Sequence, residues 1–225
     1  MKTHEVAPNV WRLPLLQPDM LNVYLAGDVL IDAGGRASQR RLLAALRRHT
    51  IFAHALTHAH LDHQGGSHAV CEAFGVPLWC GADDREAVES GDLTRVLPDP
   101  NAWIARLSRR FAGPAHPVAR VLKDGDEVGD FTVIETPGHT PGHLAFWREH
   151  DGVLIIGDVL FHRNPVTFRA GLAEPFGFAT FDPSANRDSA RKLAALEPRV
   201  VCFGHGEPLT DGARFCGFVA GLPHL

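Results

Sequence analysis

Hydrophobic positions early in the chain fall into short runs of β-branched and aromatic residues that end at turn residues. Residues 9–16 (NVWRLPLL) and 21–35 (LNVYLAGDVLIDAGG) have this pattern, which is typical of strands in a hairpin or meander. The Gly27-Asp28 pair predicts a turn inside the second run, and the paired glycines at its end predict where the strands stop.

Helices are expected where apolar residues return every three or four positions. Residues 38–49 (SQRRLLAALRRH) carry Leu42, Leu43 and Leu46 on one face and arginines on the other, which predicts an amphipathic helix begun by Ser38. The other helices are predicted at residues 67–75, 82–90, 101–111 and 182–196, the last capped by Asp182 or Ser184.

Short apolar runs between these helices predict further strands, at residues 51–58, 76–80, 199–204 and over most of 121–157. Strands with one helix layer are thus followed by strands with another, which predicts an α/β protein with two helix-covered sheets packed face to face. Residues 160–181 have no clear period and contain five phenylalanines: Phe161, Phe168, Phe176, Phe178 and Phe181. Since long irregular segments in compact domains are often functional, we expect a pocket wall there.

Composition supports one large domain, expected to span residues 1–225. With 45% hydrophobic residues, a chain of 225 residues can bury a sizeable core. The formal net charge of −4 gives no overall basic field, so no nucleic-acid partner is expected.

The N-terminal residues (MKTHEVAPNVWRLPLL) lack the apolar core of a signal peptide, and no stretch approaches the ~18 uninterrupted apolar residues of a membrane span. The four cysteines form no C-x-x-C pair and are expected to be reduced, mostly buried thiols: Cys71, Cys80, Cys202 and Cys216. We therefore expect a cytoplasmic protein without membrane contact.

The segment THAHLDHQGG, residues 57–66, brings together His58, His60, Asp62 and His63. Side chains this close repel one another when they carry like charges. A bound cation removes this repulsion, because all of them can then coordinate one positive centre. Imidazole and carboxylate groups at short spacing, without cysteine, are ligands for zinc, manganese or iron.

Three further candidates follow buried strands: His139 lies between two Pro-Gly turns, Asp158 ends VLIIGD, and His205 follows VVCFG. Strand ends can direct side chains into one cleft. Five histidines and two aspartates are too many for one four-coordinate ion but suit two that share a carboxylate. The sequence predicts two divalent metal ions, with zinc favoured and iron or manganese as alternatives.

These motifs, in this order, resemble the metal motifs of the metallo-β-lactamase superfamily, in particular its glyoxalase II-like and lactonase-like branches. The motifs are H-x-H-x-D-H at residues 58–63, T-P-G-H-T-P-G at 136–142, G-D at 157–158 and G-H-G at 204–206. The resemblance covers about residues 21–208, and LIDAGG adds the family's early aspartate, Asp32.

The resemblance implies a four-layer αβ/βα sandwich with the metals at the sheet edge. Asp32 would orient the metal loop through hydrogen bonds, or else cap the turn at the glycines that follow it. The ligands implied are His58, His60 and His139 for one metal, Asp62, His63 and His205 for the other, and Asp158 as the bridge.

Two cations would lower the pKa of a bridging water toward ~7, and the hydroxide would attack a carbonyl carbon while the ions stabilise the developing charge. Asp62 beside the nucleophile could pass on its proton, so Asp62 and Asp158 are the candidate catalytic carboxylates. The expected reaction is hydrolysis of an ester, thioester, lactone or amide.

The expected partner is a small-molecule substrate, and a homodimer is left open. Glutathione thioesters are disfavoured, because glyoxalase II proper uses a C-terminal helical region, whereas about twenty residues follow His205 here. Arg163 and Arg169 among the phenylalanines suggest a substrate with an apolar part and an anionic group.

A second hypothesis is an oxidoreductase resembling persulfide dioxygenases, which use one iron. Those enzymes generally lack the G-H-G histidine, so His205 favours the hydrolase. His143 could orient other groups, sit in the core or contact substrate, and His162 could face the pocket without being essential. The other histidines, including His68 and His116, are expected to have no role in a site.

Overall fold

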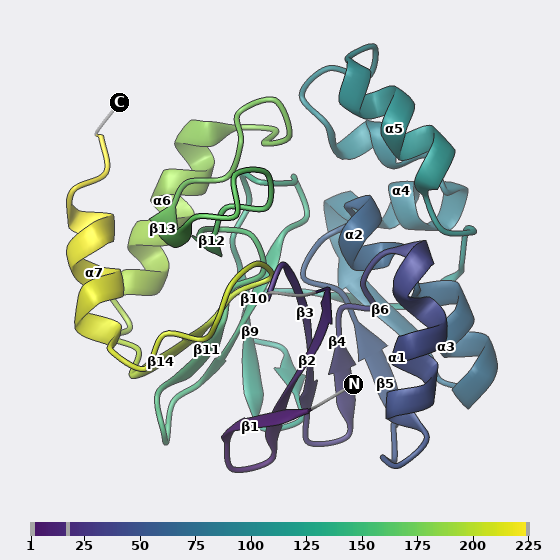
Figure 1. Cartoon of the computed structure of the whole chain (residues 1–225), viewed down its shortest axis with the longest axis horizontal. Coiled ribbons are helices and arrows are strands. Elements are labelled where there is room, and N and C mark those ends of the chain that lie inside the picture. The colour runs from purple at the N-terminus through teal and green to yellow at the C-terminus, as the bar shows by residue number, and fades with distance from the viewer. Residues whose placement is uncertain (1–2, 17–18, 224–225) are drawn as a thin grey trace.

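The computed structural model describes residues 3–16 and 19–223, and two β-sheets form its centre (Figure 1). The first four strands of the larger sheet are antiparallel, and the last three run parallel to the fourth. This seven-stranded sheet follows the chain order: β1 (His4–Ala7), β2 (Val10–Leu16), β3 (Leu21–Ala26), β4 (Val29–Ile31), β5 (Ala53–Ala55), β6 (Leu78–Gly81) and β7 (Val118–Leu122).

The second sheet has five strands, of which only the β11 and β14 pair is parallel. Their spatial order is β14 (Val200–Cys202), β11 (Val153–Ile155), β10 (Leu144–Arg148), β9 (Phe131–Glu135) and β8 (Glu127–Val128). A separate hairpin is formed by β12 (Phe161–Arg163) and β13 (Ala170–Ala173).

Helices flank both sheets (Figure 1). The helices on the side of the larger sheet are α1 (Gln39–Leu46), α2 (Leu61–Gln64), α3 (Ser67–Phe74), α4 (Arg85–Ser90) and α5 (Trp103–Phe111). The helices on the side of the smaller sheet are α6 (Pro183–Ala194) and α7 (Gly212–Ala220). Within residues 3–16 and 19–223, no helix has both the length and the apolar character that a bilayer span requires.

Three hydrophobic clusters separate the four layers. Strand β3 shows how the sequence builds two of them, because its successive side chains point to opposite faces of the sheet. Val23 and Leu25 pack with Leu42 of α1, whereas Tyr24 packs with Phe146 of the smaller sheet. The third cluster joins the smaller sheet to α6 and α7. The expected αβ/βα sandwich is confirmed.

The caps and turns explain where several elements begin. The expected turn at Gly27 and Asp28 is present. Asp182 caps α6, because its carboxylate accepts hydrogen bonds from two backbone N–H groups of the first helical turn. Ser38 precedes α1 but does not cap it, since its hydroxyl donates to the carbonyl of Gly35 instead.

Several parts of the chain differ from the expectation, among them the short elements β1 and α2, which were not predicted. Residues 160–181 contain the β12–β13 hairpin, whose short, half-exposed strands show no alternation in the sequence. Helix α7 was not predicted, because its two glycines and its aromatic residues are weak helix formers. It is held by packing, as Phe215 and Val219 are buried against the smaller sheet.

Candidate metal centre

The candidate metal centre lies at one edge of the sandwich, where strands from both sheets end. The backbone N–H of Leu144 donates to the carbonyl of Thr57 at 2.8 Å, and the N–H of Asn22 donates to that of Gly204 at 2.8 Å. These bonds join the two sheets at this edge. The segments that carry candidate ligands follow β5 (residues 57–63), β9 (residues 136–143), β11 (residues 157–158) and β14 (residues 204–206).

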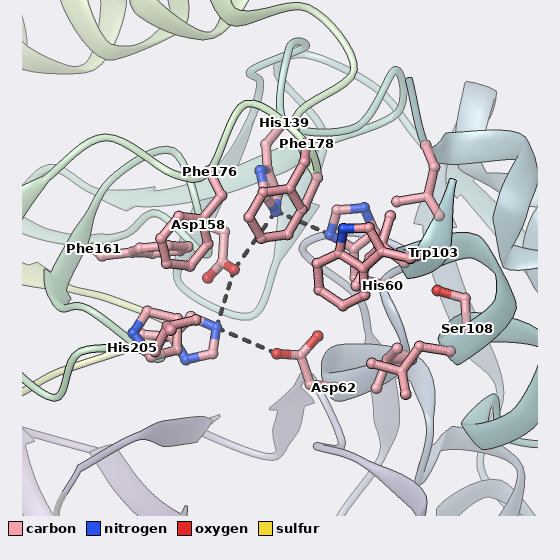
Figure 2. A pocket seen from close by; sticks show the side chains of 17 residues that line it. His60, Asp62, Trp103, Ser108, His139, Asp158, Phe161, Phe176, Phe178 and His205 are labelled. Carbon is pink, nitrogen blue, oxygen red and sulfur yellow. Dashed lines mark hydrogen bonds and ion pairs between the residues drawn. The ribbon is translucent and has the colours of Figure 1, made fainter. Parts of the chain in front are cut away.

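The seven candidate ligands converge on Asp158, which lies between two groups of donors (Figure 2). Its Oδ2 atom is 4.0 Å or less from the Nε2 atoms of four histidines: 3.1 Å from His205, 3.4 Å from His63, 3.6 Å from His139 and 4.0 Å from His58. His60 Nδ1 lies 3.0 Å from His139 Nε2 on one side, and Asp62 Oδ2 lies 3.4 Å from His205 Nε2 on the other.

These distances define three overlapping groups, in each of which the possible ligand atoms lie within 4.8 Å of one another: His58, His60 and His139; His58, His63 and Asp158; and Asp62, His63 and His205. The structure therefore brings together every candidate ligand expected from the sequence. The division into two outer sets around a central carboxylate is the one that the family resemblance implies.

Hydrogen bonds fix the tautomers of three imidazoles. His63 Nδ1 donates to Asp32 at 2.8 Å, and His205 Nδ1 donates to the carbonyl of Met20. Thr57 donates its hydroxyl proton to Asp32, so His58 Nδ1 must donate to that hydroxyl at 3.0 Å. In the neutral form of each ring, the Nε2 atom that faces Asp158 therefore carries the lone pair.

This donor set fits divalent metal ions. The Nε2 atoms of His58 and His63 and the Oδ1 atom of Asp158 are buried without a hydrogen-bond partner, and such atoms are costly unless something binds them. The nitrogens of His60 and His139 also face each other at 3.0 Å, a separation that a shared cation accounts for. Hydrogen bonds from the second ring nitrogen to a carboxylate or carbonyl are usual for metal-binding histidines.

Burial and the neighbouring carboxylates give the histidines of the centre different pKa values. Burial, with the other imidazoles, lowers the pKa of His58 and His139 well below the usual value, and burial lowers that of His60 to about 4. Burial also opposes a charge on His205, but Asp158 and Asp62 outweigh it and raise its pKa to about 10. Asp158 and Asp32 likewise outweigh burial at His63 and raise the pKa of this imidazole well above its usual value. Metal binding must therefore displace protons from this side of the centre.

Asp84 is a buried residue of this site that the sequence did not single out. Its Oδ2 accepts hydrogen bonds from the backbone N–H of Ala59 at 2.7 Å and the hydroxyl of Thr140 at 2.8 Å. Its Oδ1 accepts one from the N–H of Gly142 at 2.8 Å. Asp84 thus links residues 57–63 to residues 136–143 through hydrogen bonds. In the sequence it belongs to an ordinary Asp83-Asp84 pair before a helix, and nothing there distinguishes it from the exposed Asp83.

Gly204, the first residue of G-H-G, is required by the packing of the centre. A Cβ atom at this position would lie 2.2 Å from Asp158 Oδ1 and 2.6 Å from the His63 ring. The first glycine of the G-H-G motif is therefore needed because the backbone there passes close to Asp158 and His63, and the motif also places His205.

The structure also places the residues whose roles the sequence left open. His143 is buried, its Nε2 accepts the backbone N–H of Asp158 at 3.2 Å, and its ring stacks on His58. It positions ligands and is not among the residues that line the pocket described next. His162 is bound to the carbonyl of Glu207, and Arg163 to that of Phe168, so neither faces this pocket.

A pocket of about 260 Å³ opens directly onto the centre (Figure 2). Asp62, His60, His139, Asp158 and His205 form its polar end. Its remaining walls are largely apolar and come mainly from α5 and from the segment after Asp158, including Trp103, Leu107, Phe161, Phe176 and Phe178. Three of the five phenylalanines expected to form a pocket wall thus do so, whereas Phe168 and Phe181 are exposed and lie outside the lining.

The fold and the cluster of histidines and aspartates define a metal-dependent hydrolase class. Residues 16–205 match the family model described as the metallo-beta-lactamase superfamily. The chain belongs to this superfamily.

Similarity to individual proteins agrees with this membership. The chain is 30% identical over 203 residues to the "Probable metallo-hydrolase YflN" of Bacillus subtilis, covering 81% of this chain and 76% of that protein. It is 32% identical over 192 residues to "Hydroxyacylglutathione hydrolase GloC" of Haemophilus influenzae, covering 81% and 82%. The crystal structure of TTHA1623 "in a di-iron-bound form" superposes with a TM-score of 0.70 at 30% identity, covering 93% and 97%.

Proposed function

We propose that this protein uses two divalent metal ions, with zinc favoured, to hydrolyse an ester, thioester, lactone or amide bond in a small molecule. The observation that carries the proposal is the grouping of seven donors, six of them buried, into two sets on either side of Asp158. His58, His60 and His139 would hold one ion, and Asp62, His63 and His205 the other. When bound, such a pair lowers the pKa of a water toward ~7 and stabilises negative charge on a substrate oxygen.

The chain's own residues have separate tasks in this reaction. Asp158 keeps both donor sets together, and its position is fixed because its backbone N–H donates to His143. Asp62 lines the pocket with 36% of its side chain exposed, so its carboxylate is placed to receive a proton and pass it outward. The apolar walls exclude water from the other sides of the substrate.

The pocket supports a substrate whose acyl part is apolar. Among the described residues that line it, none is a lysine or arginine, and Ser108 is the one hydroxyl-bearing side chain. A glutathione thioester carries two carboxylates, which this lining does not neutralise. We therefore favour an uncharged apolar acyl group over the glutathione thioesters indicated by the name of the Haemophilus influenzae relative. The anionic substrate group expected from Arg163 and Arg169 is not part of the proposal, because neither arginine lines the pocket.

Partner and location are part of the same proposal. A largely apolar pocket of about 260 Å³ suits a small molecule rather than a nucleic acid or a membrane. The four cysteines are free thiols, and Cys71, Cys80 and Cys202 are buried, which supports a reducing compartment such as the cytoplasm.

The test combines metal analysis with a substrate panel. Protein purified without added metal is analysed for metal content and assayed with esters, thioesters, lactones and amides that carry either apolar or charged acyl groups. We expect about two divalent ions per chain and turnover of apolar substrates. One iron per chain with oxygen uptake would support the dioxygenase instead. If the protein shows neither hydrolysis nor oxygen uptake, the proposal is refuted.

A matched pair of histidine variants separates the two hypotheses. His205→Ala removes a donor of the second set and should abolish most hydrolysis, whereas a mononuclear oxygenase should tolerate it. His162→Ala is the control, because His162 bonds to the carbonyl of Glu207 outside the pocket.

A further inference from the structure

A second cluster of metal-ligating side chains lies outside the centre described above and shares no residue with it. It consists of His68, Glu72 and His116, which no pattern in the sequence connects. One possible ligand atom from each of the three lies within 4.8 Å of the other two.

Two parts of the fold create this cluster. His68 and Glu72 are four residues apart on α3, so they lie on the same face of the helix. His116 comes from the segment between α5 and β7, and its backbone N–H donates to the carbonyl of Val88 at 3.3 Å. Two separate parts of the fold therefore hold the cluster.

The two imidazoles approach each other closely. His68 Nδ1 lies 3.2 Å from His116 Nδ1, with the rings inclined at 70°. Burial and the nearby His68 lower the pKa of His116, so this imidazole offers a lone pair at neutral pH. Donor atoms on a tetrahedral ion with bonds of about 2.0–2.1 Å are themselves separated by about 3.3 Å, close to the observed distance.

We propose that His68, Glu72 and His116 form a separate binding site for a borderline divalent metal such as Zn²⁺. Two imidazoles and one carboxylate form a common zinc ligand set, and water completes the coordination because all three residues are partly or fully exposed. Such a site binds more weakly than the buried centre, since fewer of its positions come from the protein.

The site would brace the segment that carries the ligands of the main centre. Residues 112–117 pack against residues 64–66, as Gln64 donates to the carbonyl of Pro114 at 3.3 Å. A Cβ atom at Gly113 would lie 2.3 Å from the Gly65 carbonyl oxygen, so the two backbones are in direct contact. An ion that joins His116 to His68 therefore holds this contact just beyond His63.

The test is zinc binding to the full chain, measured by equilibrium dialysis over micromolar free Zn²⁺ and followed by elemental analysis. The wild type should take up one equivalent beyond the tightly held metal. His116→Ala should weaken this equivalent by about tenfold or more. Glu72→Gln lies at an exposed position that tolerates substitution. It should also weaken binding of the additional zinc equivalent, without affecting folding.

The matched control is His150→Ala, which removes a histidine that is 66% exposed and belongs to neither cluster. It should bind the same amount of zinc as the wild type. The proposal is overturned when wild type shows no additional equivalent, when His116→Ala and Glu72→Gln bind as the wild type does, or when His150→Ala loses as much zinc as they do.

Discussion

The carboxylate of Asp84 accepts a hydrogen bond from the backbone N–H of Ala59 at 2.7 Å, although 25 residues separate them. Ala59 stands between His58 and His60, so this bond fixes the backbone that presents two candidate ligands. The other oxygen binds Gly142, three residues after His139. One buried side chain therefore sets the spacing between ligand segments from the two halves of the chain.

Asp84→Asn should lower metal affinity by about 10- to 100-fold, because an amide offers one acceptor oxygen where the carboxylate offers two. The buried donors left unpaired should also reduce the free energy of unfolding by about 1–3 kcal/mol. Metal titration and urea unfolding measure the two effects. Asp83→Asn, at the exposed neighbouring position, should change neither, and equal behaviour of the two variants would refute the positioning role.

Gly204→Ala should disrupt the metal centre. The added methyl group would meet Asp158 Oδ1 at 2.2 Å, so the ligand or the backbone must move, with an overpacking cost of about 1–3 kcal/mol. Metal content and hydrolysis should both fall. Gly217→Ala is the control, because a Cβ there meets nothing within 4 Å and should stabilise α7 by up to about 1 kcal/mol. Full metal loading of Gly204→Ala would contradict the packing described here.

Trp103 and Phe178 should determine the size of the acyl group. They line the pocket from two different segments, with ring centroids 5.2 Å apart. Replacing either by Ala should reduce kcat/KM for a bulky apolar acyl substrate by about tenfold or more, with little change for an acetyl substrate. Phe111→Ala, on the same helix but outside the pocket lining, should have no such effect. An equal loss for both substrates would instead indicate damage to the centre.

His54 should make the free energy of unfolding decrease as the pH falls below about 6.5. It is fully buried between the carbonyl of Leu30 and the hydroxyl of Ser67, and burial lowers its pKa from 6.5 to about 4. As pH falls through this window the unfolded chain takes up a proton before the folded one does, so stability present above pH 6.5 is lost toward pH 4.

Comparison with a variant isolates this contribution. Between pH 6 and 4.5, the unfolding free energy of His54→Gln should fall less steeply than that of the wild type, by up to about 1.4 kcal/mol per pH unit. Urea unfolding in the presence of a chelator measures both slopes. Identical slopes would show that His54 has the same pKa in the folded and the unfolded chain, which would contradict the effect of its burial.

Much of the architecture could be predicted because it depends on local patterns. Alternating apolar positions in β3 and the leucines of α1 indicate buried faces directly. The ligand motifs were recognisable because each follows a buried strand. Residue Asp84 could not be found in this way, since its role depends on two segments 25 and 58 residues away in the sequence.

The second cluster shows the same limit. His68 and Glu72 have helical spacing, but no local pattern connects them with His116, which reaches them only through tertiary packing. Helix α7 likewise forms because a hydrophobic surface is available for Phe215, rather than because its residues favour a helix. Features that arise from long-range contacts therefore required the structure.

The candidate ligands of the main centre are divided between the two sheets: residues 58–63 follow a strand of the larger one, whereas His139, Asp158 and His205 follow strands of the smaller one. Neither half of the chain carries a complete set. Metal loading and the docking of the sheets are consequently linked equilibria, and stability should grow with the logarithm of free metal concentration above the dissociation constant. Withdrawal of metal in the cell would then lower the protein's resistance to unfolding, and its lifetime, together with its catalytic capacity.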